Sequence, residues 1–394
     1  MELTDYLPDT ARETVEDFSS WVQRYSDKLS NLFAERTDLD DLGKSRGMPP
    51  FLLREVQSFA PLSTYIPEEH GGRGGKVAEC LSMLEATSYH SLPLSLIMGI
   101  NGALFLQPVA KYGQEEVKEP VFSRFIDEKN MGGLMITEPD HGTDALNMKT
   151  QYREADDHYH IDGLKHWAGL TGWADFWLVT AREKNGKDSL SRDIDFFICD
   201  SRQGGIEVEE YYENLGLYMI PYGRNRIDAR VPHENKLQPE TTGIHMMLDV
   251  LHRSRFQFPG IAMGYLRRML DEAVDHCRDR LVGSKKLFSY DQVRSRLTRL
   301  QASVTACTAM CVYTAENAGM DENMAGRGVT ANAIKSVVTD LMHDASQSLL
   351  QLVGAKGYRL DHIAGRSMVD SRPFQIFEGS NDVLYSQIAE GVLK

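Results

Sequence analysis

Cysteine is scarce in this 394-residue sequence. The chain has five cysteines, an odd number, and no Cys-x-x-Cys pair. This low density excludes a disulfide framework and favours a reduced, cytoplasmic protein. Cys307 and Cys311 continue an apolar series with three- and four-residue steps, which predicts a buried helix face. Neither has a histidine or another cysteine at ligand spacing, so we predict no metal site.

Positive charge is also in deficit. Lysine and arginine number 43 against 57 aspartates and glutamates, which gives a formal net charge of −14. An acidic chain is a poor general binder of nucleic acid or of an anionic membrane. Any phosphate group that the protein handles must therefore be bound at a local site.

Long apolar runs are nearly absent as well. One uncharged and mostly apolar stretch, residues 91–110, is long enough to compare with a membrane span. It contains two prolines and the amides Asn101 and Gln107, so a buried helix pair explains it better than a span. The acidic residues 1–5 have no apolar segment and do not predict a signal peptide.

The periodicity of the apolar residues changes twice along the chain. Helical spacing up to residue 131 gives way to short β-rich runs and turn dipeptides, and helical spacing returns at residue 243. We therefore predict an α+β multidomain protein. Its expected parts are an N-terminal α-helical domain (1–131), a middle antiparallel β domain (132–242) and a C-terminal four-helix bundle (243–394).

The individual elements follow from the same patterns. The predicted strands include residues 134–136, 159–161, 176–180, 196–198, 206–208 and 227–231. The dipeptides Asp162-Gly163 and Asn185-Gly186 are typical of turns between strands. The predicted C-terminal helices cover residues 244–282, 290–318, 328–353 and 374–392.

Two segments of the β region have the composition of a ligand site. Residues 135–144 (MITEPDHGTD) run from a strand into a turn rich in hydroxyls and backbone N–H groups, which suits an anionic or carbonyl-rich ligand. In residues 163–175, Trp167 is followed by small residues and offers a flat wall for a planar ring. Taken alone, the first also fits a hairpin corner and the second a core tryptophan.

A third segment, residues 372–383 (RPFQIFEGSNDV), carries a carboxylate between an apolar run and a glycine turn. Glu378 follows Ile376 and Phe377, whose desolvating effect would raise its pKa and suit a general base. Ser380 and Asn381 are good helix N-cap types. Taken alone, the segment fits a solvated loop glutamate better.

Together and in this order, the three segments resemble the acyl-CoA dehydrogenase family, and the resemblance extends over nearly the whole chain. Residues 65–72 (YIPEEHGG) are similar to a loop of the family's N-terminal domain. Residues 351–358 (QLVGAKGY) are similar to the segment that reaches the neighbouring subunit's FAD. Residues 377–380 (FEGS) resemble the motif that bears the catalytic base.

The resemblance implies an FAD-dependent enzyme that forms an α,β double bond in an acyl thioester, of CoA or of an acyl carrier protein. By this resemblance Glu378 removes the α-proton while hydride passes from Cβ to flavin N5. An electron-transferring flavoprotein is the implied acceptor, and a homodimer or homotetramer the implied assembly. The implied cofactor-binding residues are Met135, Ile136, Thr137, Gly142, Thr143, Trp167, Gly169, Arg280, Gln351, Gly354, Ser380 and Asp382. The implied substrate-binding residues are Thr143, Arg255, Phe377 and Gly379.

Comparison with the family's pattern bears on the base and on the alternatives. Some relatives carry the base next to the position of Arg255, where this chain has Ser254, so Glu378 is the one candidate. Arg255 matches an arginine behind the family's base, and its charge would help to keep Glu378 ionised. Gly169 replaces the family's usual threonine, which leaves a flavin-dependent oxidase or monooxygenase as an alternative. Residues 280–284 (RLVGS) lack the family's aromatic, and the two departures together leave a non-catalytic FAD- or thioester-binding protein as another alternative.

The positive charges of the chain are unevenly distributed. Residues 251–300 contain eleven lysines and arginines but five acidic residues, an excess of six positive charges. The resemblance places this window near the FAD pyrophosphate and the thioester carrier. The alternative is that these residues lie on ordinary solvated helix faces, as some of them surely do.

Overall fold

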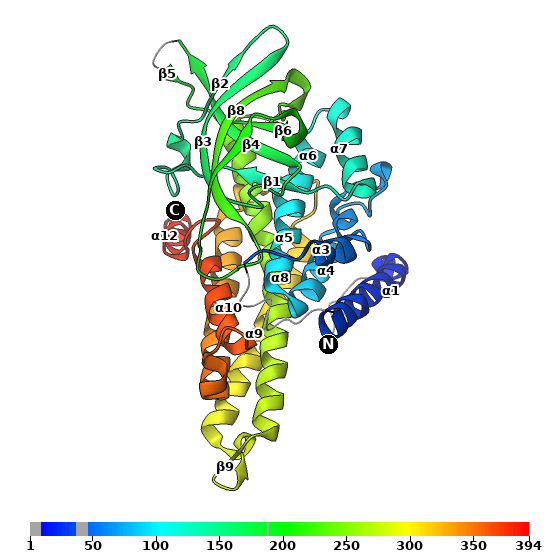
Figure 1. Cartoon of the computed structure of the whole chain (residues 1–394), viewed down its shortest axis with the longest axis vertical. Helices are drawn as coiled ribbons and strands as arrows, with labels where there is room; N and C mark the ends of the chain where they lie inside the picture. Colours follow the sequence, from blue (N-terminus) through cyan, green and yellow to red (C-terminus); the bar gives the residue numbers. More distant parts are fainter. Residues whose placement is uncertain (1–8, 37–45, 187–188, 394) are drawn as a thin grey trace.

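The computed structural model describes residues 9–36, 46–186 and 189–393. Helices come first along the chain, a sheet follows, and further helices complete it; the sheet lies at one end of a long helical body (Figure 1). The N-terminal helices are α1 (Asp9–Asn31), α3 (Pro50–Gln57), α4 (Val77–His90), α5 (Leu92–Asn101), α6 (Gln107–Tyr112) and α7 (Glu115–Asp127).

In the described part of the chain, eight strands form one sheet. They are β1 (Gly132–Met135), β2 (Gln151–Glu154), β3 (His158–Gly169), β4 (Phe176–Asn185), β5 (Ser189–Leu190), β6 (Asp195–Asp200), β7 (Ile206–Tyr211) and β8 (Tyr222–Pro232). The order is β1-β4-β2-β3-β8-β7, with β5 and β6 also paired to β4. The sheet is mixed, because β4 runs parallel to β1 and β2, and this corrects the prediction of antiparallel pairing throughout.

One of the two predicted turn dipeptides is wrong. Asp162 and Gly163 lie inside β3, where they pair with β8. A Cβ on Gly163 would come within 2.3 Å of Oγ1 of Thr150, so the glycine serves a close approach between segments and not a turn. Asn185 and Gly186 do end β4, and Gly186 has a φ of +78°.

The C-terminal part is helical. Its elements are α8 (Gly243–Asp279), α9 (Asp291–Asn317), α10 (Gly328–Val353), α11 (Ile363–Ser371) and α12 (Asn381–Leu393). The first three long helices match their predicted ranges to within a few residues, whereas α11 was not predicted. The predicted start of the last helix at residue 374 is wrong, because Glu378 and Gly379 have φ values of +57° and +88° and interrupt the helix.

Helices α8 and α9 extend together to a small hairpin at the end of the molecule far from the sheet (Figure 1). This hairpin consists of β9 (Leu281–Val282) and β10 (Lys285–Lys286). On α9, Cys307 and Cys311 lie on the buried face, which confirms the prediction of core thiols.

The apolar stretch of the sequence forms α5, the π-helical turn η5 (Gly102–Leu106) and α6. Residues Leu92–Tyr112 are long and apolar enough to cross a membrane, but 94% of the apolar window is buried inside the fold. The two amides have protein partners: Asn101 Oδ1 accepts from Gly132 N at 2.7 Å, and Gln107 Oε1 accepts from Gln257 at 2.7 Å. The predicted buried helix pair is confirmed, and its amides tie it to β1 and α8.

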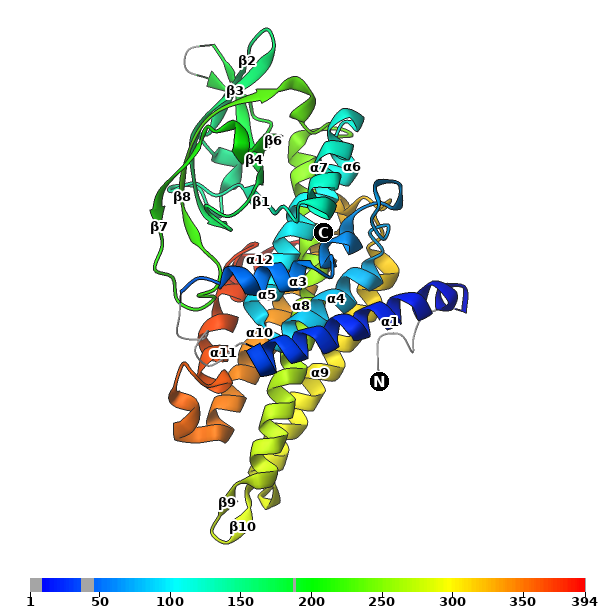
Figure 2. The same cartoon turned by 45° about the vertical axis from the view of Figure 1, so that its right-hand side comes forward.

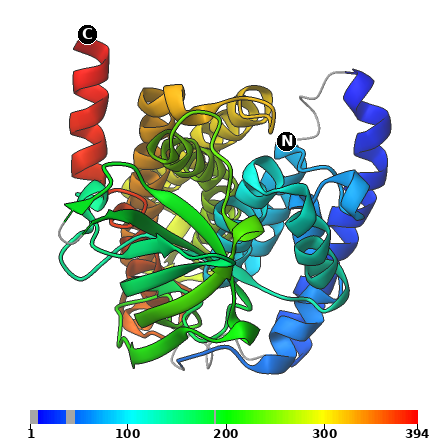
Figure 3. The same ribbon diagram turned by 90° about the horizontal axis from the view of Figure 1, so that it is seen from above.

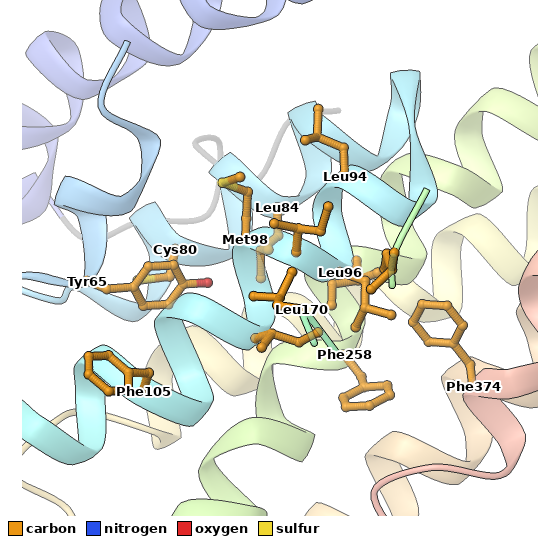
Figure 4. Packing of buried hydrophobic residues seen from close by; sticks show 14 of the residues in the cluster. Tyr65, Cys80, Leu84, Leu94, Leu96, Met98, Phe105, Leu170, Phe258 and Phe374 are labelled. Carbon is orange, nitrogen blue, oxygen red and sulfur yellow. The ribbon is translucent and has the colours of Figure 1, made fainter. Parts of the chain in front are cut away.

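Buried side chains from distant parts of the sequence meet around α5. Leu96 of α5, Leu170 at the end of β3, Phe258 of α8 and Phe374 lie close together in one hydrophobic cluster (Figure 4). Helix α5 therefore packs between the sheet and α8, and the hollow described below opens beside it.

The two ends of the described chain lie on opposite sides of the molecule. Helix α1 lies across the N-terminal helices on one side (Figure 2), and α12 projects from the body on the other (Figure 3). On α12, Tyr385, Val392 and Leu393 expose 42, 71 and 86% of their surface. This helix thus presents apolar side chains to the outside of the chain.

Candidate active site

A cavity of about 420 Å³ opens where the sheet, α5 and α8 meet the turn that precedes α12. Its inner wall is apolar, with side chains of α5, η5 and α8. These are Leu96, Ile100, Ala103, Leu104, Met247, Leu251, Phe258 and Ile261. A mostly apolar hollow with a few polar groups at fixed places is typical of a small-molecule site.

The wall formed by the sheet carries an aromatic ring in an unusual backbone position. The register of β3 against β8 shifts between His166 and Ala168, so Trp167 is left out of the ladder. Trp167 has a φ of +57° and exposes 52% of its surface, although it lines the cavity. A bulge of this kind redirects a side chain. Here the indole is directed at the cavity and also contacts Tyr212, with ring centroids 4.5 Å apart.

The turn after β1 lies next to this tryptophan. The backbone N–H of His166 donates to the carbonyl of Thr137 at 2.9 Å, which joins the turn to β3. Thr137, Gly142 and Thr143 line the cavity on the same side as Trp167. The hydroxyls and backbone groups of this turn are therefore available next to the flat aromatic wall.

A buried ion pair between Lys165 and Glu138 holds the turn after β1 in place. Lys165 Nζ donates to Glu138 Oε1 at 3.0 Å and to the carbonyl of Ile136 at 2.9 Å. Glu138 also accepts from the backbone N–H groups of Lys149 and Thr150. Burial raises the pKa of Glu138, but the charge of Lys165 and these hydrogen bonds outweigh it and hold the pKa below its usual value. Burial lowers the pKa of Lys165 to about 8, against the effect of Glu138.

Glu378 lies on the opposite side, in the turn between η12 (Arg372–Gln375) and α12. Its side chain lines the cavity, and its Oε2 atom is buried with no hydrogen-bond partner. Burial raises the pKa of Glu378, while the positive charges of Arg255 and Lys335 oppose the rise. A carboxylate that is desolvated, unpaired and open to a cavity is suited to accept a proton.

The source of this desolvation differs in part from the sequence prediction. Ile376 is 56% exposed and does not cover the carboxylate. Phe377 packs on Phe374 and Phe258, with ring centroids 4.9 and 6.1 Å apart. Tertiary packing against α8, and not the local apolar run alone, therefore excludes water from the surroundings of the Glu378 carboxylate.

Two cations hold the backbone of the Glu378 turn. Arg255 Nε donates to the carbonyl of Glu378 at 2.9 Å, and Lys335 Nζ donates to the carbonyl of Gly379 at 2.8 Å. The Nη1 atom of Arg255 also donates to Asn332 Oδ1 at 2.6 Å. Arg255 therefore lies next to Glu378 and contacts its backbone.

Most of the predicted site residues meet at this cavity. Those that line it are Ile136, Thr137, Gly142, Thr143, Trp167, Gly169, Arg255, Phe377, Glu378 and Gly379. Those that do not are Met135, Arg280, Gln351, Gly354, Ser380 and Asp382. Met135 is buried in the core, and Arg280 follows α8 at the far end of the molecule.

Gln351 borders a second hollow, of about 340 Å³, between α9 and α10. Arg296 and Arg299 line the same hollow. The excess of positive charge in residues 251–300 is thus divided within the chain: Arg255 lies at the cavity, Arg296 and Arg299 lie here, and Lys285 and Lys286 lie in the end hairpin. The structure does not bring these groups together within one chain.

Several residues of the site were not predicted from the sequence. Lys335 and Asn332 of α10 contact the Glu378 turn and its arginine, and Tyr212 covers Trp167. Lys335 lies in a stretch of mixed character, Asn332-Ala333-Ile334-Lys335-Ser336-Val337, which does not set it apart from other helix lysines. Asn332 and Tyr212 have no distinguishing signal either.

The polar side of the cavity contains Ser254 as well as Glu378. Ser254 has no group that can take up a proton near neutral pH, so of these two residues Glu378 is the base candidate. His166 and His252 also line the cavity, and their Nδ1 atoms are engaged with Tyr212 and with the Met324 carbonyl. The indole of Trp167 faces the cavity from the sheet, and the carboxylate of Glu378 faces it from the turn before α12. The arrangement has room for a planar ring against the sheet wall and an apolar chain beside α5.

Comparison with known proteins agrees with this geometry. The chain matches the acyl-CoA dehydrogenase N-terminal domain over residues 12–129, the middle domain over 133–229 and the C-terminal domain over 241–393. An acyl-CoA dehydrogenase of Bacillus subtilis (strain 168) is 24% identical over 347 residues, which cover 86% of this chain and 89% of the relative.

Solved structures show the same fold. The butyryl-CoA dehydrogenase from Megasphaera elsdenii matches with a TM-score of 0.86 at 23% identity, over 98% of this chain and 99% of that chain. The prolyl acyl carrier protein oxidase AnaB matches with a TM-score of 0.85 at 17% identity, over 95% of this chain and 99% of that chain.

Proposed function

This chain belongs to the acyl-CoA dehydrogenase family, and we propose that it removes one hydrogen each from Cα and Cβ of an acyl thioester, with Glu378 as the base. It is an FAD-dependent oxidoreductase, as members of this family are. The observation that carries the proposed mechanism is the buried Oε2 of Glu378, which has no hydrogen-bond partner and belongs to a carboxylate lining the cavity.

The residues at the sheet wall fit the ring of FAD. Trp167 lies in a β-bulge and exposes about half of its surface. A planar group bound against this wall would cover the exposed indole and stack on it. Thr137, Gly142 and Thr143 offer hydroxyls and open backbone at the edge of the same wall. Bound there, FAD supplies the acceptor for the β-hydrogen and its electron pair.

The chain's own residues perform the proton transfer and the orientation. Glu378 takes the α-proton on its carboxylate, and its backbone N–H polarises the thioester carbonyl. The apolar wall of α5 and α8 holds the acyl chain between the carboxylate and the sheet wall, which places Cα next to Glu378. The α-proton goes to Glu378 and the β-hydrogen leaves with the electron pair, so an α,β-enoyl thioester results.

The experiment is to mix the yellow holoenzyme with a panel of acyl-CoA and acyl-carrier thioesters and follow the loss of flavin absorbance. Glu378→Gln should retain FAD and lose about 10² to 10⁴ of the bleaching rate, since that is the usual contribution of a positioned general base. Glu183→Gln, at an exposed position of β4 away from the cavity, is the matched control and should bleach normally. A Glu378→Gln enzyme with bound FAD and a normal rate contradicts the assignment.

We also propose a homodimer or homotetramer, an electron-transferring flavoprotein as the acceptor and a cytoplasmic location. The apolar outer face of α12 supports association with further copies of the chain. Arg280, Gln351 and Gly354 lie away from the cavity, so a role in FAD binding requires that they meet the cofactor of another copy. The thioester panel decides between CoA and a carrier protein.

Gly169 keeps an oxidase or monooxygenase as the second candidate. A Cβ on Gly169 would lie 2.9 Å from Cδ1 of Ile100, so the threonine that is usual in the family would require the Ile100 side chain to shift. Reduced enzyme that is reoxidised by air within one turnover time supports this candidate, and slow reoxidation supports the dehydrogenase. If the protein binds FAD but its flavin absorbance is not lost with any thioester of the panel, it is a binding protein instead.

A further inference from the structure

Lys335 is a fully buried lysine that the proposed chemistry leaves without a role. It lies on α10, and its relative exposure is 0%. Among the described residues, no carboxylate lies within ion-pair distance of its ammonium group. Instead Nζ donates to the carbonyl of Gly379 and to Oδ1 of Asn381, both at 2.8 Å, and lies 5.9 Å from the centroid of the Phe258 ring.

Burying a lysine in this way is costly. The pKa of Lys335 is lowered to about 7, chiefly by burial; Glu378 and Asp340 raise the pKa, and the charge of Arg255 lowers it. A buried ammonium group without an anionic partner costs free energy, and its hydrogen bonds to protein oxygens offset part of that cost. The segment that Lys335 holds is the turn that carries Glu378.

That turn has a backbone conformation which needs support. Glu378 and Gly379 follow one another with φ values of +57° and +88°, and the left-handed region is sterically unfavourable for an L-residue such as glutamate. The carbonyls of these two residues are held by cations from different helices, Arg255 of α8 and Lys335 of α10. With both carbonyls turned toward the helices, the side chain of Glu378 is left facing the cavity.

Asn381 extends the same attachment. It receives the second hydrogen bond of Lys335, and its own amide donates to Thr339 Oγ1 at 3.0 Å and to Asp340 Oδ1 at 2.7 Å. The first residue of α12 is thereby fixed to α10. Lys335 thus lies between the turn that carries the base and the helix that the turn begins.

We propose that Lys335 is a positioning residue for Glu378: it fixes the left-handed turn through the carbonyl of Gly379, and its positive charge favours the ionised carboxylate. This inference rests on the proposed role of Glu378 as the base. It assigns two separable effects to Lys335, one through the hydrogen bonds and one through the charge.

The electrostatic effect has a definite sign. The base must be deprotonated to act, so the rate rises with pH through the pKa of Glu378. Positive charge nearby lowers that pKa, and the groups that act on it are Arg255 and Lys335. Removal of the charge of Lys335 leaves Arg255 and burial to set the pKa, so the acidic limb of the rate profile moves to higher pH.

Three substitutions separate the two effects in the FAD-bound enzyme. Lys335→Met removes hydrogen bonds and charge, Lys335→Gln retains a donor without charge, and Lys335→Arg retains the charge. We expect kcat of Lys335→Met to fall by about 10²-fold, as for a misplaced catalytic group, with a smaller change in KM. Its acidic limb should move to higher pH. Lys335→Gln should show the same shift with a smaller loss of kcat, and Lys335→Arg should keep the limb of the unmodified enzyme.

The controls decide between positioning and general loss of structure. Lys76→Met removes an exposed lysine and should change neither kcat nor the pH profile. Bound FAD and the thermal unfolding midpoint are measured for every variant. If Lys335→Met fails to fold, Lys335→Gln and Lys335→Arg still test the charge, because they must differ in the position of the acidic limb.

Two results overturn the inference. One is a normal kcat and pH profile in Lys335→Met or Lys335→Gln. The other is an equal loss of kcat in all three variants with an unmoved acidic limb, which indicates packing alone. If Glu378→Gln itself turns over normally, the proposed function fails and this inference fails with it. An inactive Glu378→Gln with normal Lys335 variants removes this inference alone.

Discussion

In the part of the chain that the structure describes, two lysines are fully buried, each near a glutamate with a desolvated carboxylate, and the two arrangements differ. Below the sheet wall, Lys165 donates directly to the carboxylate of Glu138 at 3.0 Å. Before α12, Lys335 donates to backbone and amide oxygens, and Glu378 Oε2 accepts no hydrogen bond. The same two residue types therefore form a paired carboxylate in one region and an unpaired one in the other.

The pKa directions follow from this difference. Three groups satisfy the oxygens of Glu138, and its pKa lies below the ordinary value despite burial. Arg255 and Lys335 interact with the Glu378 carboxylate electrostatically but donate their hydrogen bonds to backbone carbonyls. Burial outweighs their effect, and the pKa of Glu378 lies above the ordinary value. The pKa of a buried carboxylate, and with it the ability to act as a base, thus depends on whether the neighbouring cation donates its hydrogen bonds to the carboxylate or to the backbone.

The largest effect should come from breaking the paired arrangement. Lys165→Met leaves Glu138 charged and buried, so we expect the free energy of unfolding to fall by about 3–5 kcal/mol. Urea titration of the purified protein measures this. Arg226→Met removes an exposed partner of Asp162 and should cost at most about 1 kcal/mol. A loss below 1 kcal/mol in Lys165→Met means that the pair contributes no more than a surface contact.

The second effect is a difference in pH dependence between the two glutamates. For Glu378 the folded pKa lies above the unfolded value, so the folded state binds more protons between the two. The stability of the unmodified protein relative to Glu378→Gln should therefore decrease as pH rises through that window. For Glu138 the folded pKa lies below the unfolded value. Stability relative to Glu138→Gln should therefore decrease as pH falls through its window.

These opposite slopes are measured by urea titration of the three proteins at a series of pH values from about 3 to about 8, because the window of Glu138 lies below the ordinary pKa of a glutamate. Glutamine has nearly the same size as glutamate, so the pH-dependent part of each difference reports the ionisation. Slopes of the same sign at both positions contradict the comparison, because they mean that both carboxylates are either stabilised or desolvated in the fold.

The sequence indicates the site segments of both regions but not the lysine contacts that distinguish them. Residues 135–144 and 163–175 indicate a ligand turn and a ring wall from local composition, and Glu378 is indicated by its motif. Neither signal shows that Lys165 meets Glu138 across 27 residues, or that Lys335 meets Gly379 across 44. Such contacts depend on which strands and helices become neighbours, and local patterns carry no information about that.

The fold shows the same limit. Helical periodicity predicted α8, α9 and α10 well, because their buried faces repeat over many turns. It also extended the last helix back to residue 374, since Phe374 and Phe377 have helical spacing, and only the φ values of Glu378 and Gly379 show the interruption. The parallel pairings of β4 were missed because pairing direction depends on how the chain returns to the sheet.

The smallest predicted effect concerns the backbone at the two glutamates. Glu378→Gly and Glu378→Ala both remove the carboxylate, but glycine adopts a φ of +57° without the steric penalty. We expect the glycine variant to be the more stable by about 0.5–1 kcal/mol, after the greater flexibility of glycine in the unfolded chain is subtracted. Glu138 is not among the residues with positive φ, so there the alanine variant should be the more stable by a similar amount. Urea titration of the four variants measures both differences, and equal signs at the two positions mean that the Glu378 turn is not strained. The reversal of sign connects the unpaired carboxylate to a backbone that α8 and α10 must hold in place.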